Sequence, residues 1–160
     1  MPNVKEDLND QFFMREALKQ AQEAYRIGEV PVGAVLVYEE KIIARAYNQV
    51  ESLHDASAHA ELLCLREAAK ILSNWRLLNT TLYCTLEPCA MCLGALLLFR
   101  VSKLVWGAKD NRHGANGSWV DLLSSHHPTH SIEVETGVLA EEAGQLMTQF
   151  FQERRCARTI

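Results

Sequence analysis

Two short motifs carry the residues that could do chemistry: His-Ala-Glu at 59–61 and Pro-Cys-Ala-Met-Cys at 88–92. An imidazole and two thiolates are typical zinc ligands, and three protein ligands leave the fourth position of a tetrahedral zinc open to water. That open position distinguishes a catalytic zinc from a structural one. The spacing therefore predicts one Zn²⁺ per subunit, held by His59, Cys89 and Cys92.

The remaining chemical group in these motifs is the carboxylate of Glu61. Zinc(II) with two thiolates and a neutral imidazole is formally neutral, so it needs no further anionic ligand. Glu61 is then free to take a proton from the zinc-activated water and return it to a leaving amine, a role that contributes about 10²–10⁴ in rate. The chemistry that these parts predict is hydroxide attack on an amidine carbon, followed by loss of ammonia.

A closed, structural zinc site is the main alternative, and it would need a fourth ligand. Cys84, Cys64 and His54 are the candidates. Cys84 lies among apolar residues of an expected strand and Cys64 lies inside an expected helix, so buried packing explains both. The position of the two motifs at helix starts favours the catalytic interpretation.

The spacing within each motif restricts how the helices must point. Cys89 and Cys92 are three residues apart, which places both sulfurs on one helix face, and the first turn of a helix favours thiolate over thiol. His59 and Glu61 are two apart and do not share a face. They can serve the same site only if their helix aims its N-terminal end at the metal, so two helix starts must converge.

The elements that do this follow from periodicity, caps and turn residues. The pattern predicts helices over residues 10–27, 58–70, 89–99 and 139–155, strands over 33–38, 41–47, 81–85, 103–108 and 131–136, and loops over 48–57 and 110–118. Because strands and helices alternate after an opening hairpin, we expect an α/β fold with a mixed five-stranded sheet covered by helices on both faces.

Composition limits the classes of protein. With 160 residues and 48% hydrophobic residues, we expect one domain over 1–160, with its core at about 10–155. No apolar run is long enough for a membrane span and no secretory signal is visible, while an odd count of five cysteines fits a reducing, cytoplasmic compartment. A net charge of −4 argues against a broad basic surface, so any nucleic-acid contact must be local.

Beyond the zinc motifs, nearly the whole chain resembles the bacterial tRNA-specific adenosine deaminases of the cytidine deaminase-like zinc deaminase superfamily. The stretches that carry the resemblance are 29–35, 58–61, 81–83, 85–89 with 91–92, 107–110, 126–128, 150–151 and 154–155. The resemblance implies a three-layer α/β/α fold and a homodimer that binds a tRNA anticodon stem-loop. It further implies that adenosine at the wobble position becomes inosine through attack of zinc-activated hydroxide on C6, with Glu61 as proton shuttle.

The resemblance also implies roles for residues outside the metal site. Asn48 would hydrogen-bond the flipped nucleotide, and Val30, Pro31 and Val32 would line the base pocket. Apart from the resemblance, aromatic and basic residue types at the end of the last helix favour an RNA contact, with stabilisation of the helix dipole as the alternative. One of the two phenylalanines should still face the core, and the residues of this predicted contact are Phe150, Phe151, Arg154, Arg155 and Arg158.

Three positions depart from the expected family pattern, namely Ala56, the Asn-Arg-His run at 111–113 and the short tail at 156–160. Two other functions stay open at this point. One is a zinc deaminase of a free base or nucleotide, of the guanine or deoxycytidylate type. The other is a non-catalytic zinc module that binds RNA. The unusually apolar helix over 93–99 is consistent with a dimer interface.

Overall fold

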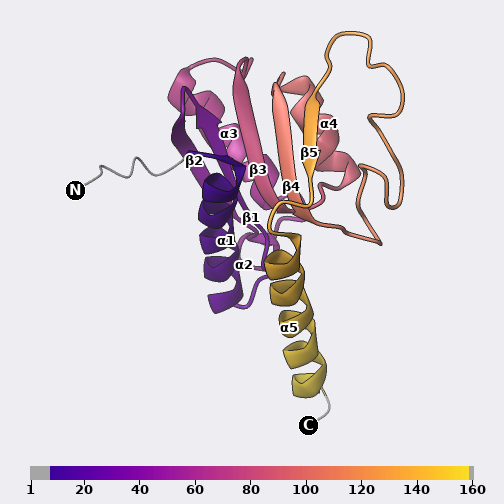
Figure 1. Ribbon diagram of the computed structural model, residues 1–160. Helices are drawn as coiled ribbons and strands as arrows, with labels where there is room; N and C mark the ends of the chain where they lie inside the picture. Colours follow the sequence, from indigo (N-terminus) through magenta and orange to yellow (C-terminus); the bar gives the residue numbers. More distant parts are fainter. Residues whose placement is uncertain (1–7, 159–160) are drawn as a thin grey trace, which may run out of the picture.

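The computed structural model describes residues 8–158 and shows, within them, a five-stranded sheet in the order β2-β1-β3-β4-β5 (Figure 1). β1 pairs antiparallel with β2 and β3, whereas β3, β4 and β5 run parallel. The strands are β1 (Gly33–Tyr38), β2 (Lys41–Tyr47), β3 (Thr80–Leu86), β4 (Lys103–Ala108) and β5 (Glu133–Thr136). The helices are α1 (Asp10–Arg26), α2 (Val50–Leu53), α3 (Ala60–Leu72), α4 (Ala90–Leu98) and α5 (Ala140–Arg158).

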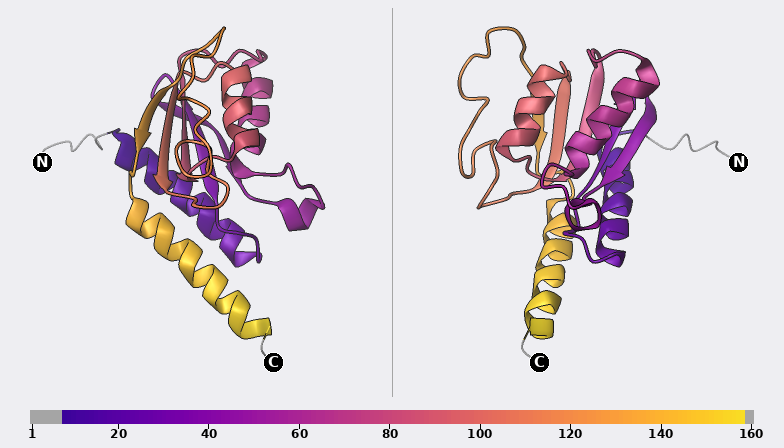
Figure 2. Two further views of the ribbon diagram at one scale, coloured as in Figure 1. Left: turned by 90° about the vertical axis from the view of Figure 1, so that its right-hand side faces the viewer. Right: turned by 180° about the vertical axis from the view of Figure 1, so that it is seen from behind.

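Helices cover both faces of the sheet, as expected (Figures 1 and 2). α1 and the start of α5 lie against one face, and α3 and α4 lie against the other, while the rest of α5 extends beyond the ends of the strands. The alternation of side chains along β1 shows why: Leu36 belongs to the cluster under α3 and α4, while Val35 and Val37 pack against Phe13 of α1. Since both faces are buried, the central strands are apolar throughout rather than alternately polar.

The packing of α1 depends on a glycine at the start of β1. A Cβ on Gly33 would collide with backbone atoms of Ala17 and Ala21 in α1. The side chain of Asn9 caps the N-terminal end of this helix by accepting a hydrogen bond from the Phe12 amide at 3.0 Å. Helix and sheet are therefore fixed close together near the beginning of β1.

Most elements lie within two residues of their predicted bounds, but two predictions were wrong in an informative way. Residues 50–53 form the short helix α2 inside the expected 48–57 loop, because the carboxylate of Glu29 accepts hydrogen bonds from the amides of Glu51 (3.2 Å) and Ser52 (2.6 Å). α5 also continues three residues beyond its expected end, to Arg158.

No helix in the described part of the chain is long and apolar enough to cross a membrane. The expectation that no secretory signal is present concerns the first ten residues, and most of these lie outside the described residues.

Candidate active site

The two helix starts converge as the motif spacing predicts. α3 and α4 begin at Ala60 and Ala90, and the residue before each, His59 and Cys89, has extended backbone at the helix N-cap. Cys92 lies in the first turn of α4. The sequence therefore places two ligands on the caps themselves and one inside a helix, all at one end of the sheet.

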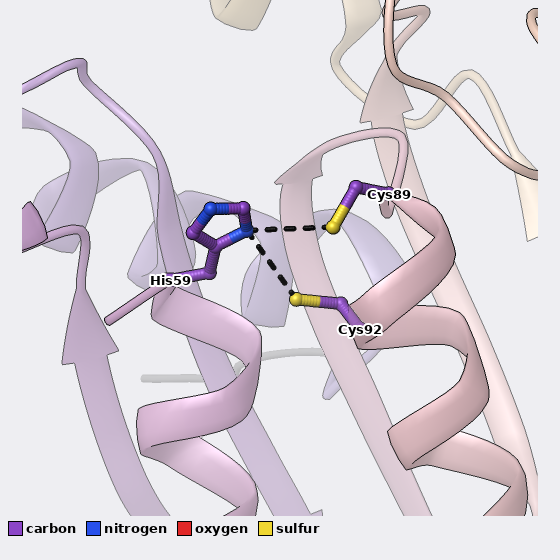
Figure 3. A group of neighbouring side chains, drawn as sticks. All are labelled: His59, Cys89 and Cys92. Atoms are coloured by element: carbon purple, nitrogen blue, oxygen red, sulfur yellow. Dashed lines mark hydrogen bonds between the residues drawn. The ribbon is translucent and has the colours of Figure 1, made fainter. Parts of the chain in front are cut away.

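Figure 3 shows the three side chains pointing at one another. His59 Nδ1 lies 3.4 Å from Cys89 Sγ and 3.6 Å from Cys92 Sγ, and the three ligand atoms all lie within 4.8 Å of one another. A tetrahedral zinc with Zn–N near 2.0 Å and Zn–S near 2.3 Å needs its nitrogen and sulfur ligands about 3.6 Å apart. The residues present therefore fit zinc.

Among the described residues, the cluster of potential metal ligands contains His59, Cys89 and Cys92 and no other side chain. The suggested fourth ligands Cys64 and Cys84 are fully buried, and Cys64 Sγ lies 3.5 Å from the Ala44 carbonyl. Burial raises the pKa of both thiols, which makes them unreactive core residues. The donor set is thus that of an open, catalytic zinc.

Hydrogen bonding between the two ligand cysteines shifts the pKa values of their thiols in opposite directions. The hydrogen bond from Cys92, together with the one from His59, outweighs partial burial and lowers the pKa of Cys89 to about 4. The same hydrogen bond, with burial and the neighbouring carboxylate, raises the pKa of Cys92. Because zinc binds both sulfurs as thiolates, metal binding must displace any proton that this pair retains.

Glu61 lies in the first turn of α3 and is only 4% exposed. Burial raises the pKa of its carboxyl group, although hydrogen bonding to Cys92 and the charge of His59 act in the opposite direction. The carboxylate lies beside the ligand trio without belonging to it. A buried carboxyl group beside the metal ligands is suited to accept a proton and to release it again.

A cavity of about 1140 Å³ opens over this cluster and connects several segments. Of the residues expected at the base pocket, Val30, Val32 and Asn48 line this cavity, whereas Pro31 is buried and does not line it. Residues 109–113 line the cavity as well. All three departures from the family pattern therefore reach the cavity wall: Ala56, the run 111–113 and, through Arg158, the tail.

Asn48 offers the cavity an unused acceptor. Its side-chain nitrogen donates to the Val30 carbonyl at 3.2 Å, which fixes the orientation of the amide. The residue is 7% exposed, and its Oδ1 has no hydrogen-bond partner among the described residues. Because an unpaired buried acceptor is costly, this oxygen is a natural partner for an N–H or O–H of a bound substrate.

The end of α5 completes the cavity, and all five predicted RNA-contact residues line it. Phe150 is 5% exposed and packs edge-on against Tyr25, whereas Phe151 is 43% exposed. Arg154 lies 4.8 Å above the Phe150 ring and donates to the Gly28 carbonyl. Phe150 and Arg154 thus hold α5 in place, while Phe151 presents its ring to solvent, in agreement with the expectation that one phenylalanine faces the core.

Sequence reasoning missed three residues that shape the cavity. Glu29 and Glu87 are buried carboxylates, 1% and 2% exposed, and each accepts hydrogen bonds from a segment far along the chain. The sequence feature that could have identified both glutamates is an acidic residue within a short apolar stretch. Trp119 also lines the cavity and is 63% exposed, and no local pattern indicated it.

A zinc-binding trio with an uncoordinated carboxylate beside it, at the edge of an α/β/α sandwich, defines the class of zinc-dependent nucleobase deaminases. The comparisons with known proteins agree with that class. Residues 7–108 match the family described as cytidine and deoxycytidylate deaminase zinc-binding region.

The chain is 49% identical to the tRNA-specific adenosine deaminase of Bacillus subtilis, over 91% of this chain and 91% of that protein. It is 51% identical to the chloroplastic tRNA(adenine(34)) deaminase of Arabidopsis thaliana, over 91% of this chain but only 12% of that longer protein. A solved structure from a study of A-to-I editing by tRNA:A34 deaminases superposes with a TM-score of 0.81 and 39% identity, covering 84% of this chain and 98% of that one. The chain belongs to the tRNA-specific adenosine deaminases within the zinc-binding cytidine and deoxycytidylate deaminase family.

Proposed function

We propose that this chain, acting as one deaminase domain over 1–160, hydrolyses adenosine at the wobble position of a tRNA anticodon to inosine and ammonia. The observation that carries the proposal is the uncoordinated, buried carboxylate of Glu61 beside the three-ligand cluster, in a chain that matches tRNA adenosine deaminases along nearly its full length. Water and adenosine supply all the atoms of inosine and ammonia, so no further co-reactant is needed.

When bound, zinc supplies a Lewis acid that lowers the pKa of a water towards about 7. The chain's own contribution is the handling of the proton. Glu61 accepts the proton that the attacking water loses and delivers it to the 6-amino nitrogen, which leaves as ammonia. Burial limits the access of bulk solvent to this carboxylate.

Asn48 and the segment that leads into β1, with Val30 and Val32, orient the base. The free Oδ1 of Asn48 accepts a hydrogen bond from the nucleotide, and Val30 and Val32 contact the flat faces of the purine. Enzymes that act on a base within a nucleic acid take it out of the stack and hold it in such a pocket.

The side chains at the rim of the cavity support a polynucleotide over a free base or nucleotide. The rim contains Phe151, Arg155 and Arg158, side chains suited to unpaired bases and phosphates. We propose a cytoplasmic location, which the odd count of five cysteines supports.

We also propose a homodimer formed through the outer face of α4. Leu93 and Leu96 of this helix are buried in the core, but Leu98 is 65% exposed and Met91 is 40% exposed. Apolar side chains on the solvent side of an otherwise buried helix are typical of an interface between identical subunits. A Leu98→Lys variant should sediment as a monomer where the unaltered protein sediments as a dimer.

A deamination assay on a panel of substrates tests the proposed reaction. Zinc-loaded protein is incubated with an anticodon stem-loop that carries adenosine at the wobble position, with the same loop carrying that adenosine elsewhere, and with free guanine, cytidine and deoxycytidylate. The proposal expects inosine at the wobble position alone. Turnover of a free base or nucleotide without turnover of the stem-loop would assign the site to the other class of deaminase.

A further inference from the structure

Trp119 has an unusual place for a large apolar side chain. It is 63% exposed and lines the cavity at its rim. A solvent-exposed indole contributes little to folding, because its hydrophobic surface stays in water. An exposed aromatic side chain beside a binding cavity is typical of a contact surface for a ligand.

The loop that carries Trp119 is tied down by a buried carboxylate. Glu87 is 2% exposed, and its Oε2 accepts hydrogen bonds from the amides of Asn116 (2.9 Å) and Ser118 (3.3 Å). Its Oε1 accepts from the Ser118 hydroxyl and from the Asp110 amide at 3.3 Å. One side chain thus fixes the loop at three points, the last of them directly before Trp119.

Two further contacts hold the backbone around this carboxylate. The Trp119 amide donates to the Gly114 carbonyl at 2.8 Å, and the Ala115 amide donates to the Pro88 carbonyl at 2.8 Å. A Cβ on Gly114 would collide with the Glu87 carboxylate, so the loop packs directly onto it. The indole is exposed on a fixed backbone, so little backbone entropy is lost when a binding partner covers it.

The neighbouring side chains indicate the chemistry of that partner. Arg112 and Lys109 line the same cavity as Trp119, in a chain whose net charge is −4. A flat aromatic surface with basic neighbours, next to a pocket that holds one base, suits the adjacent base and its phosphates in single-stranded nucleic acid.

We propose that Trp119 is a stacking platform for the unpaired base next to the target nucleotide, and that Glu87 is the positioning residue that holds it there. This inference rests on the proposed function, and it adds a binding site for a second nucleotide. A second copy of the chain is the competing partner for Trp119, and the experiment distinguishes the two.

Binding of stem-loop RNA tests the platform. Dissociation constants are measured in a Glu61→Gln background, so that the RNA is not consumed. Trp119→Ala should weaken binding about 5- to 100-fold, the range for loss of one base stack, while Trp119→Phe should stay within about threefold. Trp75 is the matched control: it is 50% exposed, stacks with Arg76 at 4.1 Å and does not line the cavity, so Trp75→Ala should leave binding unchanged.

RNA with a single base removed locates the contact. Stem-loops that lack the base on the 5′ or the 3′ side of the target are compared, and Trp119→Ala should cause no further loss with one of them. An equal loss on every RNA would overturn the proposal, as would conversion of a dimer into a monomer by Trp119→Ala. If the unaltered protein binds no stem-loop, the proposed function fails as well; if it binds and Trp119→Ala binds equally, only this inference fails.

Glu87→Gln tests the positioning role with readouts that do not depend on activity. Gln keeps one acceptor oxygen but cannot accept from the amides on both sides, so amide hydrogen exchange should accelerate over 110–118 and not in β1 or α1. Zinc content should stay at one per chain, and the loss of RNA affinity should not add to that of Trp119→Ala. Loss of zinc, or unchanged exchange in the loop, would show that Glu87 does not act through the loop.

Discussion

Replacing Glu61 by Gln separates the proton shuttle from the metal site. The two side chains have nearly the same shape, and the ligand cluster of His59, Cys89 and Cys92 does not include Glu61. The variant should therefore bind zinc as the unaltered protein does, and it should lose the group that carries the proton from water to the leaving amine.

The structure indicates the size of the effect. General acid–base groups contribute about 10²–10⁴ in rate, which is about 2.7–5.5 kcal/mol of barrier. Glu61 is 4% exposed, so bulk water cannot easily replace it, and the loss should lie in the upper half of that range. Most of the loss should appear in kcat, because the carboxylate acts on the reacting atoms.

The assay measures inosine formation in a stem-loop under saturating substrate, together with zinc content by atomic absorption. Glu67→Gln is the control, since Glu67 lies on the same helix but is exposed to solvent, and its activity should be unchanged. The reasoning is refuted if Glu61→Gln empties the metal site, because the carboxylate would then be a ligand, or if the variant keeps more than about a tenth of the activity.

Three further predictions concern stability and the metal. Gly33→Ala should lower the free energy of unfolding in urea by about 1–3 kcal/mol or more, because the new Cβ meets the backbone of α1, which cannot move aside; an unchanged midpoint would contradict this packing. Burial alone would raise the pKa of Glu29, but hydrogen bonds from Ser52 and Glu51 and the charge of Arg154 lower it below the usual glutamate value. The ionised Glu29 carboxylate therefore stabilises the folded protein at pH values above the pKa of Glu29 in the unfolded chain, and this stabilisation is lost as the pH falls through the pKa of Glu29 in the folded protein. Glu29→Gln should therefore cost about 1–3 kcal/mol at neutral pH and progressively less below the usual glutamate range, and a pH-independent difference would count against the role of the charge. Removal of zinc with a chelator should abolish turnover and lower the melting temperature, both restored by added Zn²⁺, whereas a chelated protein that stays active would exclude zinc catalysis.

What could be predicted from the sequence depended on short-range signals. The Cys89–Cys92 spacing specifies a shared helix face, and the two-residue period of any strand places Val35 and Leu36 on opposite faces of β1. The ligand trio and the uncoordinated Glu61 were predicted from residue types, formal charge and the His-x-Glu and Pro-Cys-x-x-Cys signature, and the structure confirms that the three ligands converge.

The rest required contacts between distant segments. α2 forms because Glu29, twenty-two residues before Glu51, accepts its amide hydrogen bond, and the loop before Trp119 is held by Glu87 from thirty-one residues away. Local propensity contains no information about such pairs. The choice between Phe150 and Phe151 as the buried ring was likewise decided by a tertiary contact, that of Phe150 with Tyr25.

X-ray absorption at the zinc edge of the metal-loaded protein tests the central claim most directly, because it counts the atoms bound to the metal. The account predicts two sulfur neighbours at about 2.3 Å, one imidazole nitrogen and one further light atom that exchanges with solvent or substrate analogues. A third sulfur, from Cys64 or Cys84, or a fourth protein ligand of any kind would make the site structural and contradict the assignment as a deaminase.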